Sequence, residues 1–305
     1  MWQGMSATTA PICSIPHLRT PWRGDEIVRV CGRLDALKGT GRRPAWRRDQ
    51  FVGLYNQAKF RDDTDSAIQI IRDMVPDDAL VLDRIIDDAE PHMKRGTPIL
   101  LACPSPAFDA PEDLALANRK LISVNALPHT LATELAGAIG GEPDIEIAQV
   151  ARVGRTKLTG LQRFLWQPNF AGEVRRDAAY ILVDDVLTKG ASFAAMRSYV
   201  LSQGGTVCSY VALAHGSGND RSLALTARVR DELIALFGNE FSGFWRREIG
   251  HDMESLTDAE GLSLIEWWRK ADKRSGASPI QRLRDSLLET KSRGSDQESS
   301  KTARG

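Results

Sequence analysis

Residues 178–192 read AAYILVDDVLTKGAS, and this stretch decides the fold that the sequence predicts. Its first six residues are predominantly apolar, which is typical of a strand buried on both faces of a sheet. Two acids and a short loop follow, and residues 193–200 then carry apolar side chains at helical spacing. A Gly-Gly pair at 204–205 ends that helix, and residues 206–214 (TVCSYVALA) form the next apolar strand. A strand, a helix and a strand with short connections predict a βαβ unit and a parallel sheet.

The sequence before this stretch extends the same pattern. Residues 98–103 (PILLAC) predict another buried strand, residues 128–139 predict a helix, and residues 145–153 (IEIAQVARV) predict a further strand. Residues 155–176 are polar and basic, and a loop of that length in a compact domain is often functional. We therefore expect an α/β fold with a central, mostly parallel sheet and flanking helices.

The chain divides into four segments by composition. Residues 1–45 show no clear period, and residues 46–220 contain the α/β pattern. Residues 221–288 predict a helical C-terminal extension, in which residues 257–260 (TDAE) have the spacing of a capping box. Residues 289–305 hold almost no apolar side chain, so we expect a disordered tail.

Composition excludes several classes of protein. The 305 residues include 40 Lys plus Arg and 40 Asp plus Glu, so the net charge is zero and gives no strong field for nucleic acid or a membrane surface. No apolar run reaches the ~20 residues of a membrane span. The N-terminal residues lack a basic start followed by an apolar core, and the four cysteines form no Cys-x-x-Cys pair. These features favour a cytoplasmic protein with reduced thiols and no membrane partner.

The strongest chemical signal lies just after the apolar run. Asp184 and Asp185 stand at the expected carboxyl end of a parallel strand, where open α/β sheets bind ligands. The next helix offers free backbone N–H groups to an anion, and Gly190 allows the backbone to approach a phosphate. Thr188 and Ser192 add hydroxyl donors, and Ser192 is also expected to cap the helix. Two acids beside a phosphate cradle suit a phosphorylated sugar, with its hydroxyls on the acids.

This stretch resembles the signature of the type I phosphoribosyltransferase family, which binds 5-phosphoribosyl-1-pyrophosphate (PRPP). The resemblance covers roughly residues 54–216 and is most specific over 184–192. It implies that PRPP is bound by the two acids and by the loop that follows them, namely Asp184, Asp185, Val186, Leu187, Thr188, Lys189, Gly190, Ala191 and Ser192. Lys189 is a departure, because the commonest family pattern has a second threonine there.

The resemblance also implies roles outside the motif. A pyrophosphate loop would comprise Cys103, Pro104 and Ser105. Arg155, Lys157 or Arg163 on a mobile loop would close over the pyrophosphate, and we expect Arg155 and Lys157 to be catalytic together with the two acids. Mg²⁺ would be held through Asp184, Asp185 and waters. Within the family, residues 54–60 (LYNQAKF) and parts of 155–170 are similar to the competence-type branch.

Three functions remain open at this stage. The first is transfer of phosphoribose to a nitrogen acceptor, a nucleobase being the usual one, with release of pyrophosphate. The second is a PRPP or nucleotide sensor without catalysis, and the third is an accessory protein of DNA uptake or mobile elements. His215, near the expected site, is interpreted as structural. The acceptor is unidentified, with residues 45–88 and the segment after Phe237 as candidate hoods over it, and a homodimer is one possible assembly.

Overall fold

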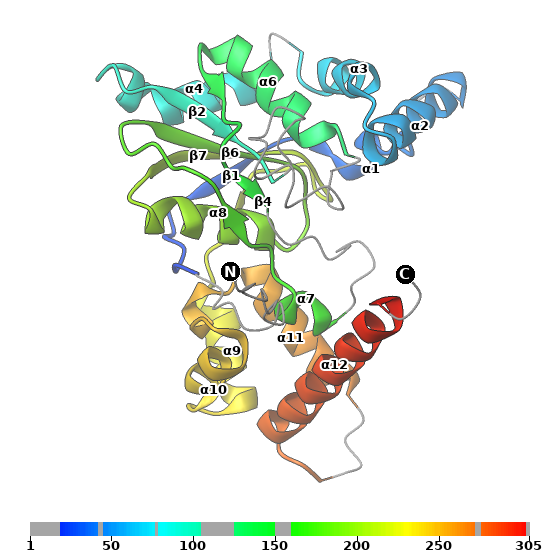
Figure 1. Cartoon of the computed structure of the whole chain (residues 1–305), viewed down its shortest axis with the longest axis vertical. Helices are drawn as coiled ribbons and strands as arrows, with labels where there is room; N and C mark the ends of the chain where they lie inside the picture. Colours follow the sequence, from blue (N-terminus) through cyan, green and yellow to red (C-terminus); the bar gives the residue numbers. More distant parts are fainter. Residues whose placement is uncertain are drawn as a thin grey trace, which may run out of the picture.

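The computed structural model describes residues 19–41, 45–76, 79–104, 125–149, 160–271 and 276–302. Figure 1 shows an α/β part built on a twisted sheet and, below it, a helical part. The main sheet has six strands in the order β3-β2-β6-β7-β1-β8. All neighbouring pairs are parallel except β1 and β8. The strands are β1 (Ile27–Arg33), β2 (Ile99–Ala102), β3 (Glu142–Pro143), β6 (Ala179–Leu187), β7 (Thr206–His215) and β8 (Arg221–Ser222). The predicted α/β class with a mostly parallel sheet is confirmed.

The central strands are buried on both faces, as their unbroken apolar sequences predict. Ile181 and Val183 of β6 belong to the core under one set of helices, whereas Tyr180 and Leu182 belong to the core under α8. The helices on the first face are α2 (Ala45–Phe60), α3 (Thr64–Met74), α4 (Leu80–Met93) and α6 (Leu127–Ile139), preceded by the short α1 (Leu34–Leu37). On the second face lies α8 (Ala191–Ser202). The helix predicted at 128–139 is thus confirmed, and it ends at Gly140 in the left-handed conformation.

The helical part has a core of its own. It consists of α9 (Ala227–Phe237), α10 (Phe241–Ile249), a 3₁₀ turn (Met253–Ser255), α11 (Asp258–Lys270) and α12 (Pro279–Thr302). The short α7 (Gln162–Leu165) joins this core from the α/β part of the sequence, and its Phe164 ring lies 5.1 Å from that of Trp245. The long loop predicted at residues 155–176 is therefore anchored in the helical part by α7, near its middle.

Three expectations differ from the structure. Residues 27–33, assigned to an undefined N-terminal segment, form β1 between β7 and β8. The strand predicted at 145–153 is described only to residue 149, where it is reduced to β4 (Ala148–Gln149). This strand pairs with β5 (Phe170–Ala171), whereas β3 takes the place beside β2 in the main sheet. The polar residues after 288, where we expected disorder, continue α12 to Thr302.

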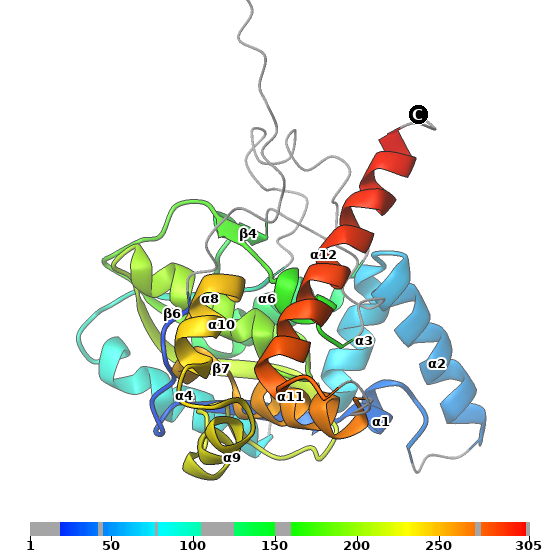
Figure 2. The ribbon, with the colours of Figure 1, turned by 90° about the horizontal axis from the view of Figure 1, so that it is seen from below.

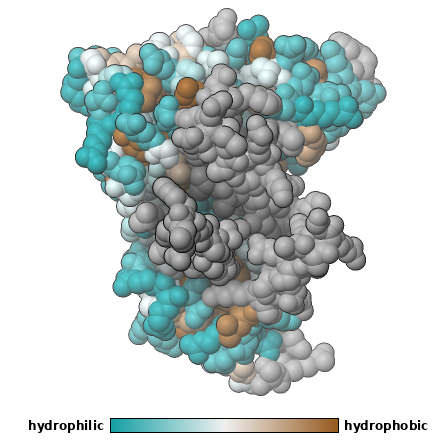
Figure 3. Space-filling view, in the orientation of Figure 1, coloured by the Kyte–Doolittle hydropathy of each residue, from teal (hydrophilic) through white to brown (hydrophobic). Residues whose placement is uncertain are grey.

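The surface of the described residues is mostly polar. Figure 3 shows separate hydrophobic residues among hydrophilic ones on the face of Figure 1, and Leu80 is the most exposed large hydrophobic residue described. In Figure 2, α12 lies on the outside of the helical part. Among the described helices, none is both long enough and apolar enough to cross a membrane.

Candidate functional site

The two acids of the motif lie inside β6 rather than after it. Asp184 is level with Ala212 of β7, and pairing continues to Leu187 and His215. The prediction that the strand stops at Asp184 is wrong, because β7 continues to pair with β6 beyond the two acids. The acids still lie near the carboxyl end of the sheet, where parallel strands place ligands.

Asp185 is buried, with 5% of its surface exposed, and it has two partners from distant parts of the chain. The ammonium of Lys59, in the last turn of α2, forms an ion pair with its Oδ2 atom. The side-chain amide of Asn125, just before α6, donates to the same oxygen at 3.0 Å. Burial by itself would raise the pKa of Asp185, but Lys59 outweighs it and holds that pKa below the usual value. Asp185 is therefore ionised at neutral pH.

Asp184 has a different environment, although it is the adjacent residue. Its Oδ1 atom accepts a 2.8 Å hydrogen bond from the backbone N–H of Asp185. Burial and the negative charge of Asp185 raise the pKa of Asp184 to about 7, while Lys59 opposes the rise. The pair therefore carries a proton that is gained or lost near neutral pH. Such a pair offers hydrogen-bond acceptors and one titrating group to a ligand.

The loop after β6 turns sharply into α8. Gly190 has φ of +78° and is the N-cap of α8, with no side-chain cap, so the prediction that Ser192 caps this helix is wrong. A Cβ atom at Gly190 would lie 2.6 Å from Leu223 Cδ1 and 3.2 Å from Thr257 Cγ2. Packing and conformation alone therefore require glycine here, and a Gly190→Val substitution does not test phosphate binding. The first-turn N–H groups of α8 remain a potential anion site.

Two basic residues are found at this loop, Lys189 within it and Arg163 near it. Lys189 is half-buried, and burial together with the nearby positive charge of Arg163 lowers its pKa, whereas Glu260 and Glu266 act in the opposite direction. Arg163 belongs to α7, so the anchoring of α7 in the helical part brings it to the loop. Of the three basic residues predicted to act from the long loop, Arg163 is thus placed near Lys189 of the motif. Arg155 and Lys157 lie outside the described residues.

The predicted pyrophosphate loop follows β2, which is the neighbour of β6. The register pairs Ala102 with Leu182, so the chain after β2 leads toward the acids. Cys103 and Pro104 are both buried, and the Cys103 side chain belongs to the core under α6. Pro104 has no backbone N–H to offer a pyrophosphate. Ser105 lies outside the described residues.

His215 ends β7 on the same side of the sheet. Its Nδ1 atom accepts a hydrogen bond from the backbone N–H of Ser217 at 3.2 Å and lies 2.9 Å from the Ser217 hydroxyl. Burial, and next the charge of Arg221, lower the pKa of His215. The ring is therefore neutral at pH 7 and orders the turn after β7, which agrees with its structural interpretation.

Sequence reasoning missed Lys59 and Asn125. Lys59 stands in residues 54–60, which were quoted only for a family likeness, and it lies 126 positions from the acid it contacts. A contact over that distance leaves no trace in local periodicity. Asn125 precedes α6 without any motif around it.

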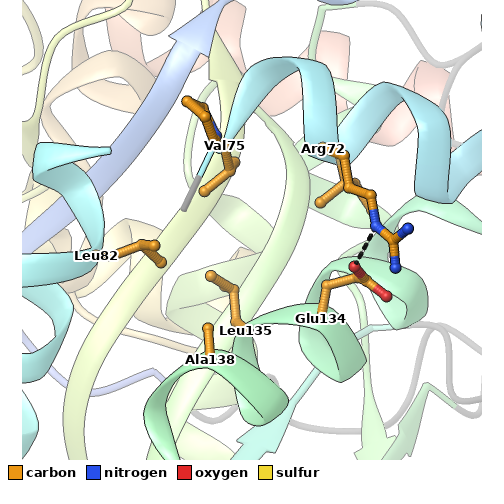
Figure 4. A pocket seen from close by; sticks show the side chains of 8 residues that line it. Arg72, Val75, Leu82, Glu134, Leu135 and Ala138 are labelled. Atoms are coloured by element: carbon orange, nitrogen blue, oxygen red, sulfur yellow. Dashed lines mark hydrogen bonds and ion pairs between the residues drawn. The ribbon is translucent and has the colours of Figure 1, made fainter. Parts of the chain in front are cut away.

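A cavity of about 470 Å³ lies elsewhere, between α3, α4 and α6. Figure 4 shows Val75, Leu82 and Leu135 on its apolar side. An ion pair between Arg72 and Glu134, with 3.1 Å between Nε and Oε2, lies at its polar side. Glu134 and Leu135 belong to the C-terminal half of α6, whereas the contact to Asp185 comes from Asn125, two residues before the helix starts. The cavity is therefore separate from the acids.

The carboxyl oxygens of Asp184 and Asp185 suit a metal ion that is brought in by a bound ligand better than a metal ion that the protein holds by itself. Among the described residues there is no group of three or more His, Cys, Asp or Glu side chains that would hold a metal. Asp185 is already paired with Lys59, and Asp184 is the remaining carboxylate. Mg²⁺ bound to a pyrophosphate keeps several waters and needs only one or two protein carboxylates, which these residues supply.

Comparison with known proteins gives two relatives. The chain is 29% identical over 206 residues to protein TraN of Escherichia coli, an alignment that covers 67% of this chain and 41% of TraN. It is 27% identical over 151 residues to an uncharacterized protein of Haemophilus influenzae, covering 49% of this chain and 29% of that protein. The chain thus spans less than half the length of either relative. No family model matches it.

Proposed function

We propose that the carboxyl end of β6 binds PRPP and that the protein transfers its phosphoribose to a nitrogen acceptor of the nucleobase type, with release of pyrophosphate. One observation carries the proposal. Asp184 and Asp185 are joined by a single short loop to the N-terminus of α8, in the middle of a parallel sheet. The acids are acceptors for ribose hydroxyls, and the helix start is a donor site for the 5-phosphate.

The order of the elements supports the same proposal. The chain passes from β2 through α6 to β3, then through the small β4/β5 sheet, and only then to β6. The resemblance to type I phosphoribosyltransferases implies a strand, a helix, a strand, a long loop and the motif strand. The third of these was expected at residues 145–153, and β3 takes its place in the main sheet. Within the sheet, β6 stands directly beside β2, so the proposed pyrophosphate loop and the acids are neighbours.

The charges fit the chemistry of the proposed reaction. Its transition state carries positive charge at the anomeric carbon and negative charge on the departing pyrophosphate. The carboxylates of Asp184 and Asp185 stabilise the positive ribose and orient its hydroxyls. Lys189 belongs to the loop and Arg163 lies near it, so both add positive charge to the loop, where Glu260 and Glu266 of α11 oppose it. Mg²⁺ would neutralise the pyrophosphate and be held through Asp184, Asp185 and waters.

A second candidate is a PRPP or nucleotide sensor without catalysis. Two observations favour it: Pro104 removes a backbone donor where pyrophosphate would be bound, and Lys59 already occupies Asp185. An accessory role in DNA uptake or mobile-element biology, a cytoplasmic location and a homodimer stay predictions.

Thermal unfolding with ligand tests the binding site. We expect PRPP with Mg²⁺ to raise the midpoint of unfolding, since a ligand at about 100 times its dissociation constant stabilises the native state by roughly 2.7 kcal/mol. Asp184→Asn should reduce that shift, because it removes a carboxylate but keeps the acceptor for the Asp185 N–H. Asp177→Asn, which alters an exposed acid paired with Arg175, is the matched control.

The same experiment separates the candidates. No shift with millimolar PRPP would contradict both the enzyme and the sensor. A shift that Asp184→Asn and Asp177→Asn reduce equally would contradict the placement of ribose at the acids. Where binding is seen, release of pyrophosphate in the presence of nucleobases identifies the enzyme, and binding without release across the set of bases identifies the sensor.

A further inference from the structure

The loop before α8 is held from the helical part of the molecule. The hydroxyl of Thr257 donates a 2.5 Å hydrogen bond to the backbone carbonyl of Lys189. Thr257 is fully buried, and it is the N-cap of α11. Its methyl group and the side chain of Leu223 occupy the space beside Gly190. The candidate phosphate loop therefore packs directly against the start of a helix from the C-terminal region.

This contact sets the direction of one peptide group. In a trans peptide the C=O of one residue and the N–H of the next point in opposite directions. Because the carbonyl of Lys189 points at Thr257, the N–H of Gly190 points away from α11. That N–H belongs to the start of α8, where free donors bind anions. A rotated peptide would turn the donor toward Thr257 and the carbonyl toward the anion.

Thr257 is itself held firmly. Its hydroxyl accepts from the N–H of Glu260 at 3.1 Å, and its own N–H donates to the Glu260 carboxylate at 3.0 Å, which completes a capping box. The same carboxylate receives two hydrogen bonds from the guanidinium of Arg19, at 2.9 and 3.0 Å. A bridge between Ala224 and Thr257 adds a backbone contact. A residue fixed by so many partners is suited to hold a neighbouring loop in one conformation.

We propose that Thr257 is a positioning residue for the phosphate-binding loop, and that α11 thereby sets the affinity of the site for the 5-phosphate of its ligand. The inference rests on the proposed binding of PRPP. It assigns the helical part a role in binding: α11 fixes the Lys189–Gly190 peptide before the ligand arrives. Such preorganisation strengthens binding because less order has to be imposed on the loop by the ligand.

The test compares three variants of the full chain. Thr257→Val removes the hydroxyl and keeps the shape, and Thr257→Ser restores the hydroxyl. Thr226→Val is the control, because Thr226 is also an N-cap whose hydroxyl accepts a helix N–H, at the start of α9. Its hydroxyl also donates to Asp258 at 2.7 Å, so this variant loosens the start of α11 without removing the hydrogen bond to Lys189. Affinity for ribose 5-phosphate and for PRPP with Mg²⁺ is measured by titration calorimetry, and stability is measured by urea unfolding.

We expect Thr257→Val to lower the urea midpoint more than Thr226→Val does, since it removes a buried cap and the hydrogen bond to Lys189, whereas the Thr226 cap is exposed. Only Thr257→Val should weaken ribose 5-phosphate binding, by about tenfold or more, the loss expected when one hydrogen bond to a charged oxygen is misaligned. Thr257→Ser should bind within about twofold of the unchanged protein, because serine caps a helix as well as threonine does.

The outcomes distinguish a failure of the proposed ligand binding from a failure of the positioning role of Thr257. If the unchanged protein binds neither ribose 5-phosphate nor PRPP, the proposed function fails and the inference fails with it. If the unchanged protein binds and Thr257→Val binds equally well, the positioning role alone is overturned. An equal loss of affinity in Thr226→Val would also overturn it, because a general loosening of the helical part would then explain the result.

Discussion

Glu260 and Asp185 are each buried against a basic side chain: Glu260 against Arg19 in the helical part, and Asp185 against Lys59 at the sheet. In the first pair both carboxylate oxygens accept from Arg19, and Arg19 also donates to Gln167 at 2.9 Å. Burial opposes ionisation of Glu260, yet the charge of Arg19 holds its pKa below the usual value. One acid faces one cation, and the charges cancel.

The second pair is not balanced. Asp184 adds a second acid beside Asp185, and among the described residues only one ammonium, that of Lys59, faces both. Burial and the charge of Asp185 raise the pKa of Asp184 to about 7, against the opposing charge of Lys59. A lysine also makes one point contact, where an arginine binds both oxygens of a carboxylate. In the first pair Arg19 occupies both oxygens of Glu260, so that carboxylate has a structural role. The second site keeps carboxyl oxygens of Asp184 and Asp185 that can accept hydrogen bonds from a ligand or bind a metal ion.

The largest effect is expected from breaking the balanced pair. Arg19→Met should lower the free energy of unfolding by about 3–5 kcal/mol, because it leaves the buried Glu260 charge without a partner. Urea unfolding at pH 7 measures the loss. Arg23→Met is the control, since the ion pair of Arg23 with Asp25 is exposed and should contribute less than about 1 kcal/mol. Equal losses in the two variants would contradict the structural role of Arg19.

A smaller effect is expected at the acids. Lys59→Met should cost about 1–3 kcal/mol at pH 8, because Asp185 loses its cation but keeps the amide of Asn125. Without Lys59 the pKa of Asp185 rises, so the carboxyl takes up a proton as the pH falls and no longer needs a cation. Urea unfolding at pH 8 and pH 5 should therefore show the loss shrinking at the lower pH. A loss that is the same at both values, or one matched by the exposed Lys94→Met, would refute the assigned pairing.

The third effect is a dependence of stability on pH, caused by Asp184, rather than a loss at one pH. Its pKa is about 7 in the folded protein and near 3.8 in the unfolded chain, so between these values the folded state binds more protons. Asp184 therefore makes stability fall as the pH rises from about 4 to 7. Asp184→Asn should remove this slope. The free energy of unfolding of the variant, relative to that of the unchanged protein, should therefore increase as the pH rises from about 4 to 7. Parallel curves of unfolding free energy against pH would show that Asp184 has an ordinary pKa.

The parts of the fold that the sequence predicts correctly are those with a local cause. The apolar runs at β2, β6 and β7 and the glycines after α6 and α8 follow from burial and from turn geometry, which neighbouring residues determine. β1 escaped prediction because the alternation of Val28, Arg29 and Val30, although typical of a strand, covers too few residues to predict one by itself. That arginine is accommodated only by Asp88 of α4 and Asp220 after β7, partners far away in the sequence.

The candidate site shows the same division. The acids and the loop were found from a contiguous motif, but their partners come from α2, from the segment before α6 and from α11. Gly190 was explained from the sequence by a close phosphate, whereas Leu223 and Thr257 already exclude any side chain there. The charge on each acid also depends on Lys59, so the sequence alone had no basis for giving Asp184 and Asp185 different protonation states.

The position of β1 in the sheet has a consequence for synthesis. Val28 pairs with Tyr210, so 210 − 28 = 182 positions separate the partners along the chain. At about 5–20 residues per second, β1 leaves the ribosome roughly 9–36 s before β7 exists to receive it. The apolar side chains of β1 must therefore wait, unpaired or held by a chaperone, until nearly the whole α/β part has been made. The sheet closes late and over a long loop, which favours slow folding and makes β1 the strand at greatest risk of pairing with another nascent chain.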